Sequence, residues 1–109
     1  MALINKVLTT SNQIIYTSSP AANQDGHAIT CMIICNTTVS DAIVSIYAVP
    51  SSKAGTNDAT TQIVNALLVP AGETVSLDQE KIVLGAGDSI TVQSDQNSLL
   101  TFTLSYIPV

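Results

Sequence analysis

Apolar and polar residues alternate with period two over much of the chain, as in Thr74-Val75-Ser76-Leu77. Successive side chains of a β-strand point to opposite faces, so this period predicts strands. Turn-forming residues interrupt the alternation about every eight to twelve positions, a spacing typical of a β-sandwich or barrel. No ten-residue window shows the periodicity of a helix, and the pattern therefore predicts an all-β protein.

The pattern predicts about eight strands, separated by turns rich in Gly, Pro, Asp and Ser. They are Gln13–Thr17, His27–Asn36, Ala42–Val49, Thr61–Val69, Glu73–Leu77, Lys81–Leu84, Ser89–Ser94 and Leu99–Ile107. Asp78-Gln79-Glu80 is expected to form a short connection, and residues 1–12 are a candidate N-terminal arm. Eight strands are enough for two packed antiparallel sheets. We expect residues 1–109 to form one antiparallel β-sandwich domain with a jelly-roll-like arrangement.

The clearest of these strands is His27–Asn36. A regular alternation would place five of its side chains on one face, namely His27, Ile29, Cys31, Ile33 and Cys35. The opposite face would carry Ala28, Thr30, Met32, Ile34 and Asn36. Both faces are mainly apolar, so we expect a central strand that is covered on both sides. Turns near Gly72, Gly85 and Gly87 are expected to place at least one of these glycines at positive φ.

Charged residues make up only 10% of the chain, against about 25% in an average soluble domain. The net charge is −5, with three Lys and no Arg. Sparse charge on a domain that can fold favours a surface that faces other protein, although a hydroxyl-rich monomer would have the same composition. Lys6, Lys53 and Lys81 are far apart in sequence, which argues against nucleic acid or an acidic membrane as partner.

No targeting segment is apparent, because Asn5-Lys6 interrupts the apolar start of the chain. We therefore expect synthesis in a cytoplasm without export by this route. The two cysteines, Cys31 and Cys35, lie four residues apart. Their Cα atoms would be about 13 Å apart on a strand, whereas a disulfide needs less than about 7 Å. We expect free and at least partly buried thiols.

Catalytic and metal-binding patterns are weak. Asp25 and His27 lack a serine in the setting of a nucleophile. Asp78 and Glu80 fall in one polar turn rather than across a cleft. Gly85-Ala86-Gly87 lacks the third glycine and the helix of a dinucleotide-binding loop, and His27 with one cysteine pair is too little for a zinc site. These features predict a protein that is not an enzyme and has no cofactor and no metal.

Two further features bear on carbohydrate. Asn36-Thr37-Thr38 matches a glycosylation sequon, but without export it is expected to be only a polar strand end. The aromatic residues are Tyr16, Tyr47, Phe102 and Tyr106. They are scattered along the sequence and are expected in the core or at an interface. A sugar-binding platform usually presents several aromatic side chains on one face, so a carbohydrate site is the weaker alternative.

The segment from Ala66 to Gln93 resembles small β-sandwich proteins encoded among bacteriophage virion genes. The matching features are the Pro70-Ala71-Gly72-Glu73-Thr74 turn, the run from Leu77 to Leu84 and the hairpin Gly87-Asp88-Ser89-Ile90-Thr91-Val92. Ile33 to Thr38 and Ala48-Val49-Pro50 also fit the pattern. The likeness covers most of the chain, from about Gln13 to Tyr106.

This resemblance implies a non-enzymatic structural protein of the virion, made in the host cytoplasm, that decorates or cements the capsid or forms part of the neck or tail. It implies a homo-oligomer, with a trimer favoured over a pentamer or hexamer, that contacts major capsid or tail proteins. The alternative is a receptor- or carbohydrate-binding module at a tail tip. A buried unpaired charge is costly, so few charges suit a surface that is covered on assembly.

Overall fold

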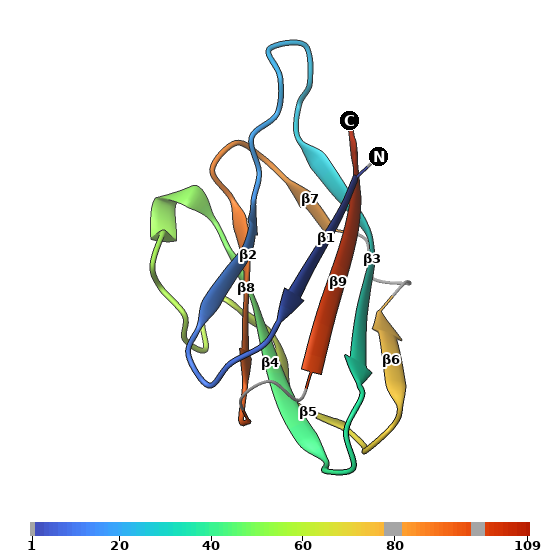
Figure 1. Ribbon diagram of the computed structural model, residues 1–109. Helices are drawn as coiled ribbons and strands as arrows, with labels where there is room; N and C mark the ends of the chain where they lie inside the picture. Colours follow the sequence, from blue (N-terminus) through green and yellow to red (C-terminus); the bar gives the residue numbers. More distant parts are fainter. Residues whose placement is uncertain (1, 78–81, 97–99) are drawn as a thin grey trace.

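The computed structural model describes residues 2–77, 82–96 and 100–109, which form two antiparallel sheets packed face to face (Figure 1). Nine strands and one short 3-10 helix are present in this part of the chain. The strands are β1 (Ala2–Val7), β2 (Gln13–Thr17), β3 (His27–Asn36), β4 (Ala42–Val49), β5 (Gln62–Val69), β6 (Thr74–Leu77), β7 (Ile82–Leu84), β8 (Ser89–Ser94) and β9 (Leu100–Pro108), and the helix η1 is Ser51–Lys53.

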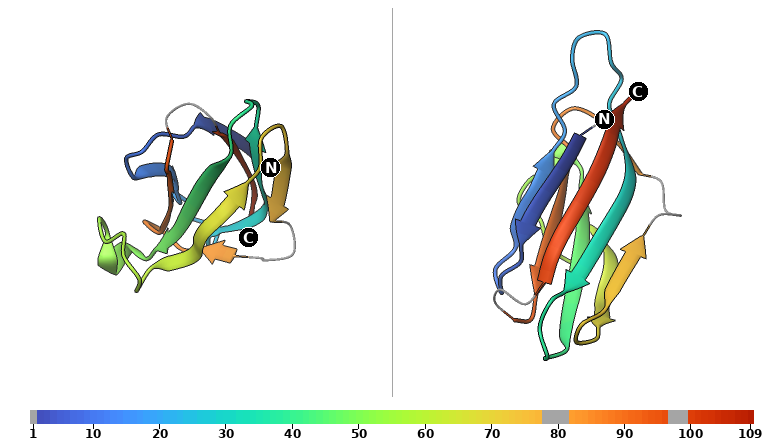
Figure 2. Two further views of the ribbon diagram at one scale, coloured as in Figure 1. Left: turned by 90° about the horizontal axis from the view of Figure 1, so that it is seen from below. Right: turned by 45° about the vertical axis from the view of Figure 1, so that its right-hand side comes forward.

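Sheet A has the order β1-β9-β3-β6, with β7 also paired to β3, and sheet B has the order β2-β8-β4-β5. If β6 and β7 are taken as one interrupted strand, both sheets have four positions, and the chain passes repeatedly from one sheet to the other. This order is that of a jelly roll. The prediction of an antiparallel, jelly-roll-like β-sandwich is confirmed (Figure 2).

Most of the predicted strand bounds agree with the structure. The predictions for β2, β3, β4 and β8 match residue by residue, and those for β5 and β6 begin one residue early. The expected short connection at Asp78-Gln79-Glu80 lies outside the described residues. Ala2–Val7, within the candidate N-terminal arm, forms β1 along the edge of sheet A and pairs with β9 from Ala2↔Tyr106 to Val7↔Thr101.

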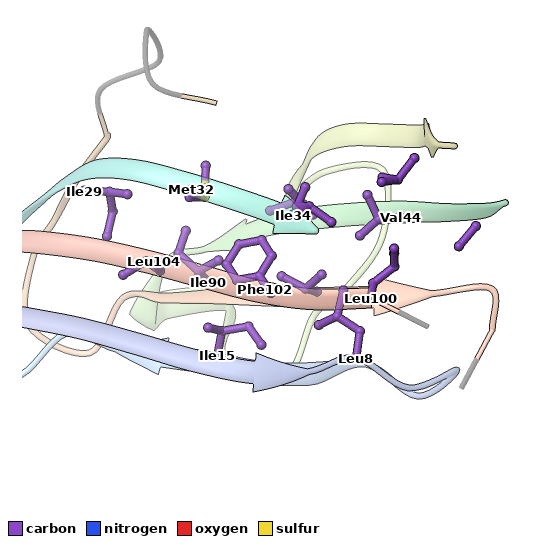
Figure 3. Close-up of a cluster of buried hydrophobic side chains, with 14 of the residues drawn as sticks. Leu8, Ile15, Ile29, Met32, Ile34, Val44, Ile90, Leu100, Phe102 and Leu104 are labelled. Atoms are coloured by element: carbon purple, nitrogen blue, oxygen red, sulfur yellow. The ribbon is translucent and has the colours of Figure 1, made fainter. Parts of the chain in front are cut away.

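The core lies between the sheets and consists of aliphatic side chains around Phe102 (Figure 3). Sheet A contributes Met32 and Ile34 from β3 and Leu100, Phe102 and Leu104 from β9; sheet B contributes Val44, Ile46, Ile90 and Val92 from β4 and β8. Burial of apolar surface stabilises a fold by roughly 25 cal/mol per Å². The strands alternate because each sheet has one face on this core.

The prediction of one regular alternation along β3 is wrong. Ile29 is opposite Tyr106 and Cys31 is opposite Ser105, so Thr30 is an extra residue in a β-bulge. The bulge moves the inward side from odd to even positions. Met32 is therefore 1% exposed, whereas Ile33 is 37% exposed on the outer face.

β3 is central in sheet A, as expected, since it pairs with β9 on one side and with β6 and β7 on the other. Its outer face, however, is not covered by a second layer from the residues that the structure describes. Cys31 and Cys35 lie on that outer face with Ile33 between them, and both thiols are free and half-buried. The expectation of free, partly buried cysteines on one face of one strand is confirmed.

Candidate functional site

His27 is directed into the protein and not toward a catalytic serine. The side chain is buried at the start of β3, and its Nδ1 pairs with the hydroxyl group of Tyr16. Asp25 is exposed in the preceding loop. A catalytic triad needs a buried acid that orients the histidine and an exposed serine as its target. The structure does not assemble these roles from Asp25 and His27.

Tyr16, His27 and Tyr106 form a ring cluster that joins the two sheets. The rings of Tyr16 and Tyr106 stack with centroids 4.4 Å apart, and the centroid of His27 lies 4.8 Å from that of Tyr106. Burial, with the neighbouring Tyr106 hydroxyl, raises the pKa of Tyr16 to about 12. A phenol that stays protonated at neutral pH is a hydrogen-bond donor and not a nucleophile. The cluster therefore holds β2 of sheet B against β3 and β9 of sheet A.

Sequence reasoning did not find this cluster, because its three members are separated by up to 90 positions. It expected Tyr16, Tyr47, Phe102 and Tyr106 in the core or at an interface. Phe102 and Tyr47 are buried, and Tyr16 and Tyr106 pack against the core. These four side chains thus present no exposed aromatic platform of the kind that carbohydrates stack on.

Asn36 and the Gly85–Gly87 segment have structural roles. Asn36 Nδ2 donates to the carbonyl groups of Ser40 and Val69, and its Oδ1 accepts from Thr38. The buried amide thus holds the turn after β3. In the second segment, Gly85 donates to the carboxylate of Asp88 and Gly87 N–H donates to the Ser18 carbonyl. The segment is a turn that carries the chain from β7 of sheet A to β8 of sheet B, which do not pair with each other, so the hairpin expected here is not formed. Its Gly85 and Gly87 amides are occupied, unlike those of a phosphate-binding loop.

The remaining sequence candidates do not form a site in the described part of the chain. Asp78, Glu80 and Lys81 lie outside it. Within it, no three His, Cys, Asp or Glu side chains gather as a metal site would require. Lys6 is on β1 and Lys53 is in η1, in different parts of the fold. None of the described helices is long and apolar enough to span a membrane.

Within residues 2–77, 82–96 and 100–109, the charges are confined almost entirely to turns and loops. Lys6 is the only Lys, Arg, Asp or Glu within the nine described strands. Four aspartates accept backbone N–H groups in connections, with donor–acceptor distances of 2.8 to 2.9 Å: they are Asp41, Asp58, Asp88 and Asp95. For Asp58, the hydrogen bonds from Thr60 lower the pKa of the carboxyl group. These four aspartates thus shape turns, and in the described part of the chain Lys6 is the one charged residue within the sheets.

Because the described charges lie almost entirely outside the strands, the outer face of sheet A is a surface whose strand residues are uncharged apart from Lys6 at its edge. Residues directly opposite in adjacent strands share a face, so the pairing register defines four rows of outward side chains. These rows are Val83–Ala28–Ile107, Cys31–Ser105–Leu3, Ser76–Ile33–Thr103–Asn5 and Thr74–Cys35–Thr101–Val7. We call these residues the uncharged face. It consists of apolar side chains, thiols and hydroxyl groups with one amide, and five of its apolar residues are exposed: Leu3, Val7, Ile33, Val83 and Ile107.

The outer face of sheet B is different, because a loop lies beside it and several of its residues are buried. The register pairs Tyr47 with Thr91 and Val49 with Ser89, on the side opposite the core residues Ile46 and Ile90. All four outward side chains are nevertheless buried, and Tyr47 and Val49 are not members of the core cluster. The loop that carries η1 leaves after Val49 and returns at Thr61, whose carbonyl accepts from Ala48 N–H. It lies on the side of sheet B away from sheet A (Figure 1).

Exposed apolar residues occur on sheet B as well. Ile14, Ile43 and Leu68 lie outward on β2, β4 and β5. Asp95 borders this face, where its carboxylate accepts from Ile43 N–H at 2.8 Å. Exposed apolar side chains are therefore not restricted to one side of the protomer, but the uncharged face of sheet A carries the larger number of them among the described residues.

The edges of both sheets are poorly suited to strand addition. On sheet A, Lys6 lies within the edge strand β1, and β6 and β7 have only four and three residues. On sheet B, β2 has one register shift and β5 has two, with Ala66 at a φ of 53°. Charged, short and irregular edge strands are the means by which proteins prevent edge-to-edge pairing. Pairing of a further strand at these edges is therefore disfavoured.

An apolar hollow of about 310 Å³ opens between the two sheets. Its lining comes from β3, β5, β6 and β7, namely Met32, Ile63, Val64, Leu77 and Ile82. No polar side chain of this lining could orient a substrate, and specific small-molecule sites usually combine an apolar wall with a few placed polar groups. The hollow by itself does not indicate a reaction.

No protein-family model matches the sequence, and no curated protein matches it. The uncharged face is thus the most distinctive feature that the structure offers for a functional interpretation.

Proposed function

We propose that the chain is a non-enzymatic structural protein of a bacteriophage virion, which decorates or cements the capsid or forms part of the neck or tail. The observation that carries the proposal is the uncharged face of sheet A. Exposed apolar patches rimmed by polar residues mark interaction sites. Neutral hydroxyl groups can be satisfied by backbone groups of a partner, whereas buried unpaired charges are costly.

Two further observations support this function. The run from Ala66 to Gln93 resembles phage virion proteins, and the strand order is that of a jelly roll, an architecture that recurs in viral capsid domains. A fold alone does not imply a function, so the strand order adds to the argument from the face and does not replace it. In this proposal the protein acts as a homo-oligomer, a trimer in the first instance, bound to a major capsid or tail protein.

The test is to purify virions of the phage or prophage that encodes the chain and to quantify their proteins by mass spectrometry. We expect the chain to remain with the particles through density-gradient centrifugation, in a fixed ratio to the major capsid protein. A copy number close to that of the major capsid protein assigns the chain to the shell. A copy number far below it assigns the chain to the neck or tail. Absence from intact infectious particles would refute the proposal.

A further inference from the structure

We propose that the uncharged face of sheet A is the surface covered by a second copy of this chain. This inference rests on the proposed assembly function and names the surface through which the homo-oligomer forms. Among the described residues, both edges of each sheet are blunted, and the outer face of sheet B is partly occupied by the loop that carries η1. No described loop covers the outer face of sheet A, and contact through this face does not require a strand to pair at an edge.

The size of the face fits a protein interface. Strand spacings of about 4.8 Å and rises of about 3.4 Å per residue give a flat area of roughly 500 Å² for four strands and seven residues of β9. Contact with an equal area of a neighbouring copy would bury roughly 1,000 Å², the lower bound for specific protein interfaces. The face thus reaches the smallest size that a specific interface requires.

The charge distribution favours a second copy as the occupant. Two copies of a chain with a net charge of −5 repel each other wherever their acidic residues approach. The acidic residues that the structure describes lie outside the strands, and none of them belongs to the four rows of the face. A charged partner would gain no ion pair from a surface without countercharges, whereas a second uncharged face would bury no unpaired charge by covering it.

Ile33 is the most informative position, because it lies between Cys31 and Cys35 on the central strand and is opposite Thr103 and Ser76. Ile33→Asp would place a charge inside the interface, where an unpaired buried charge is strongly unfavourable. Thr103→Lys adds a charge of the opposite sign at the adjacent position. Both side chains point outward, so the core is unchanged. Val39→Asp, in the exposed turn after β3, is the matched control.

The experiment is analytical ultracentrifugation of the full chain and the three variants over a range of concentrations. We expect the parent to self-associate, and both Ile33→Asp and Thr103→Lys to weaken association by roughly tenfold or more, equivalent to about 1.4 kcal/mol. Val39→Asp should associate as the parent does. A circular dichroism spectrum identical to that of the parent shows that each variant is folded.

A second measurement uses the unmodified chain. Cys31 and Cys35 lie on the proposed interface, so maleimide labelling should become slower as the protein concentration rises. A strict monomer at every concentration, or an oligomer that both variants leave intact, would overturn the inference. Neither result would contradict the virion proposal, which depends on the presence of the chain in particles; conversely, absence from particles would leave a measured self-association through this face in place.

Discussion

Gly87 combines two constraints at a single residue of the β7–β8 turn. Its φ is 83°, and a Cβ atom there would lie 2.9 Å from Cβ of Ser51. We expect Gly87→Val to lower the free energy of unfolding by about 1 kcal/mol or more, because both the dihedral angle and the contact become unfavourable. Urea unfolding followed by circular dichroism measures the change.

Gly85→Ala in the same turn is the control, since Gly85 has no positive φ and its added Cβ would meet only the Asp88 carboxylate at 3.4 Å. Its stability should stay close to that of the parent. Equal stability of Gly87→Val and the parent would show that the turn does not require the left-handed conformation.

The ionisation of Tyr16 should make the free energy of unfolding depend on pH in the alkaline range. Burial raises its pKa from 10.0 to about 12, so between these values the unfolded chain loses the phenolic proton while the folded chain keeps it. The unfolded state then binds fewer protons, and the stability that this group contributes below pH 10 is lost as the pH rises toward 12. Denaturant unfolding of the parent and of Tyr16→Phe across this range should show a steeper decline for the parent. If the stabilities of the parent and of Tyr16→Phe declined equally with pH, the raised pKa of Tyr16 would be contradicted.

At the scale of the element, β3 is defined by its bulge, which turns Cys31 and Cys35 outward and Met32 inward. Both thiols are half-buried and free. We expect a thiol reagent to titrate two groups per chain, slowly in the native protein and rapidly after denaturation. The Met32→Ala variant, whose truncated side chain lies in the core, should accelerate native labelling by promoting unfolding. Immediate labelling of both thiols in the native parent, or a Cys31–Cys35 disulfide, would contradict the placement of both cysteines on one intact, half-buried strand.

β1 and the residue after it show how the beginning of the chain contributes to stability. Leu8 is 0% exposed in the core, whereas its neighbour Val7 is 53% exposed on the outer face. We expect Leu8→Ala to cost about 2 to 5 kcal/mol and Val7→Ala much less, because only the first leaves a cavity. Thermal unfolding of the two variants provides the comparison. Similar midpoints would indicate that residues 1–12 are an arm with little part in the fold.

The molecule as a whole separates its charges from its sheets. In the described part of the chain, four aspartates accept backbone N–H groups in turns, and the strands carry a single charge at Lys6. Association through the uncharged face would therefore depend on apolar burial. Salt screens the repulsion between acidic protomers and leaves apolar burial intact. We expect light scattering to show association that is unchanged or stronger at higher salt, and sulfate to favour it further. Dissociation by salt would point instead to an ion-paired interface.

Much of the fold followed from local pattern. Alternation and turn residues predicted strands such as Ala42–Val49 and Ser89–Ser94, because the two-residue period and the dihedral preferences of Gly, Pro and Asp are properties of short segments. The scarcity of charge, which a composition reveals directly, pointed to a surface that meets other protein. The free thiols also followed from a local distance, since two residues four apart on a strand are too far apart to bond.

Other features depend on pairing between distant segments, which no local pattern encodes. Thr30 becomes a bulge only because Ile29 and Cys31 face consecutive residues of β9, and this pairing decides which residues of β3 are inward. Ala2–Val7 becomes a strand by pairing with β9, and Tyr16, His27 and Tyr106 meet only when the two sheets pack. The uncharged face has the same origin. The sequence determined that its strands carry almost no charge, but only the register of five strands, β1, β3, β6, β7 and β9, brought their outward side chains into one surface.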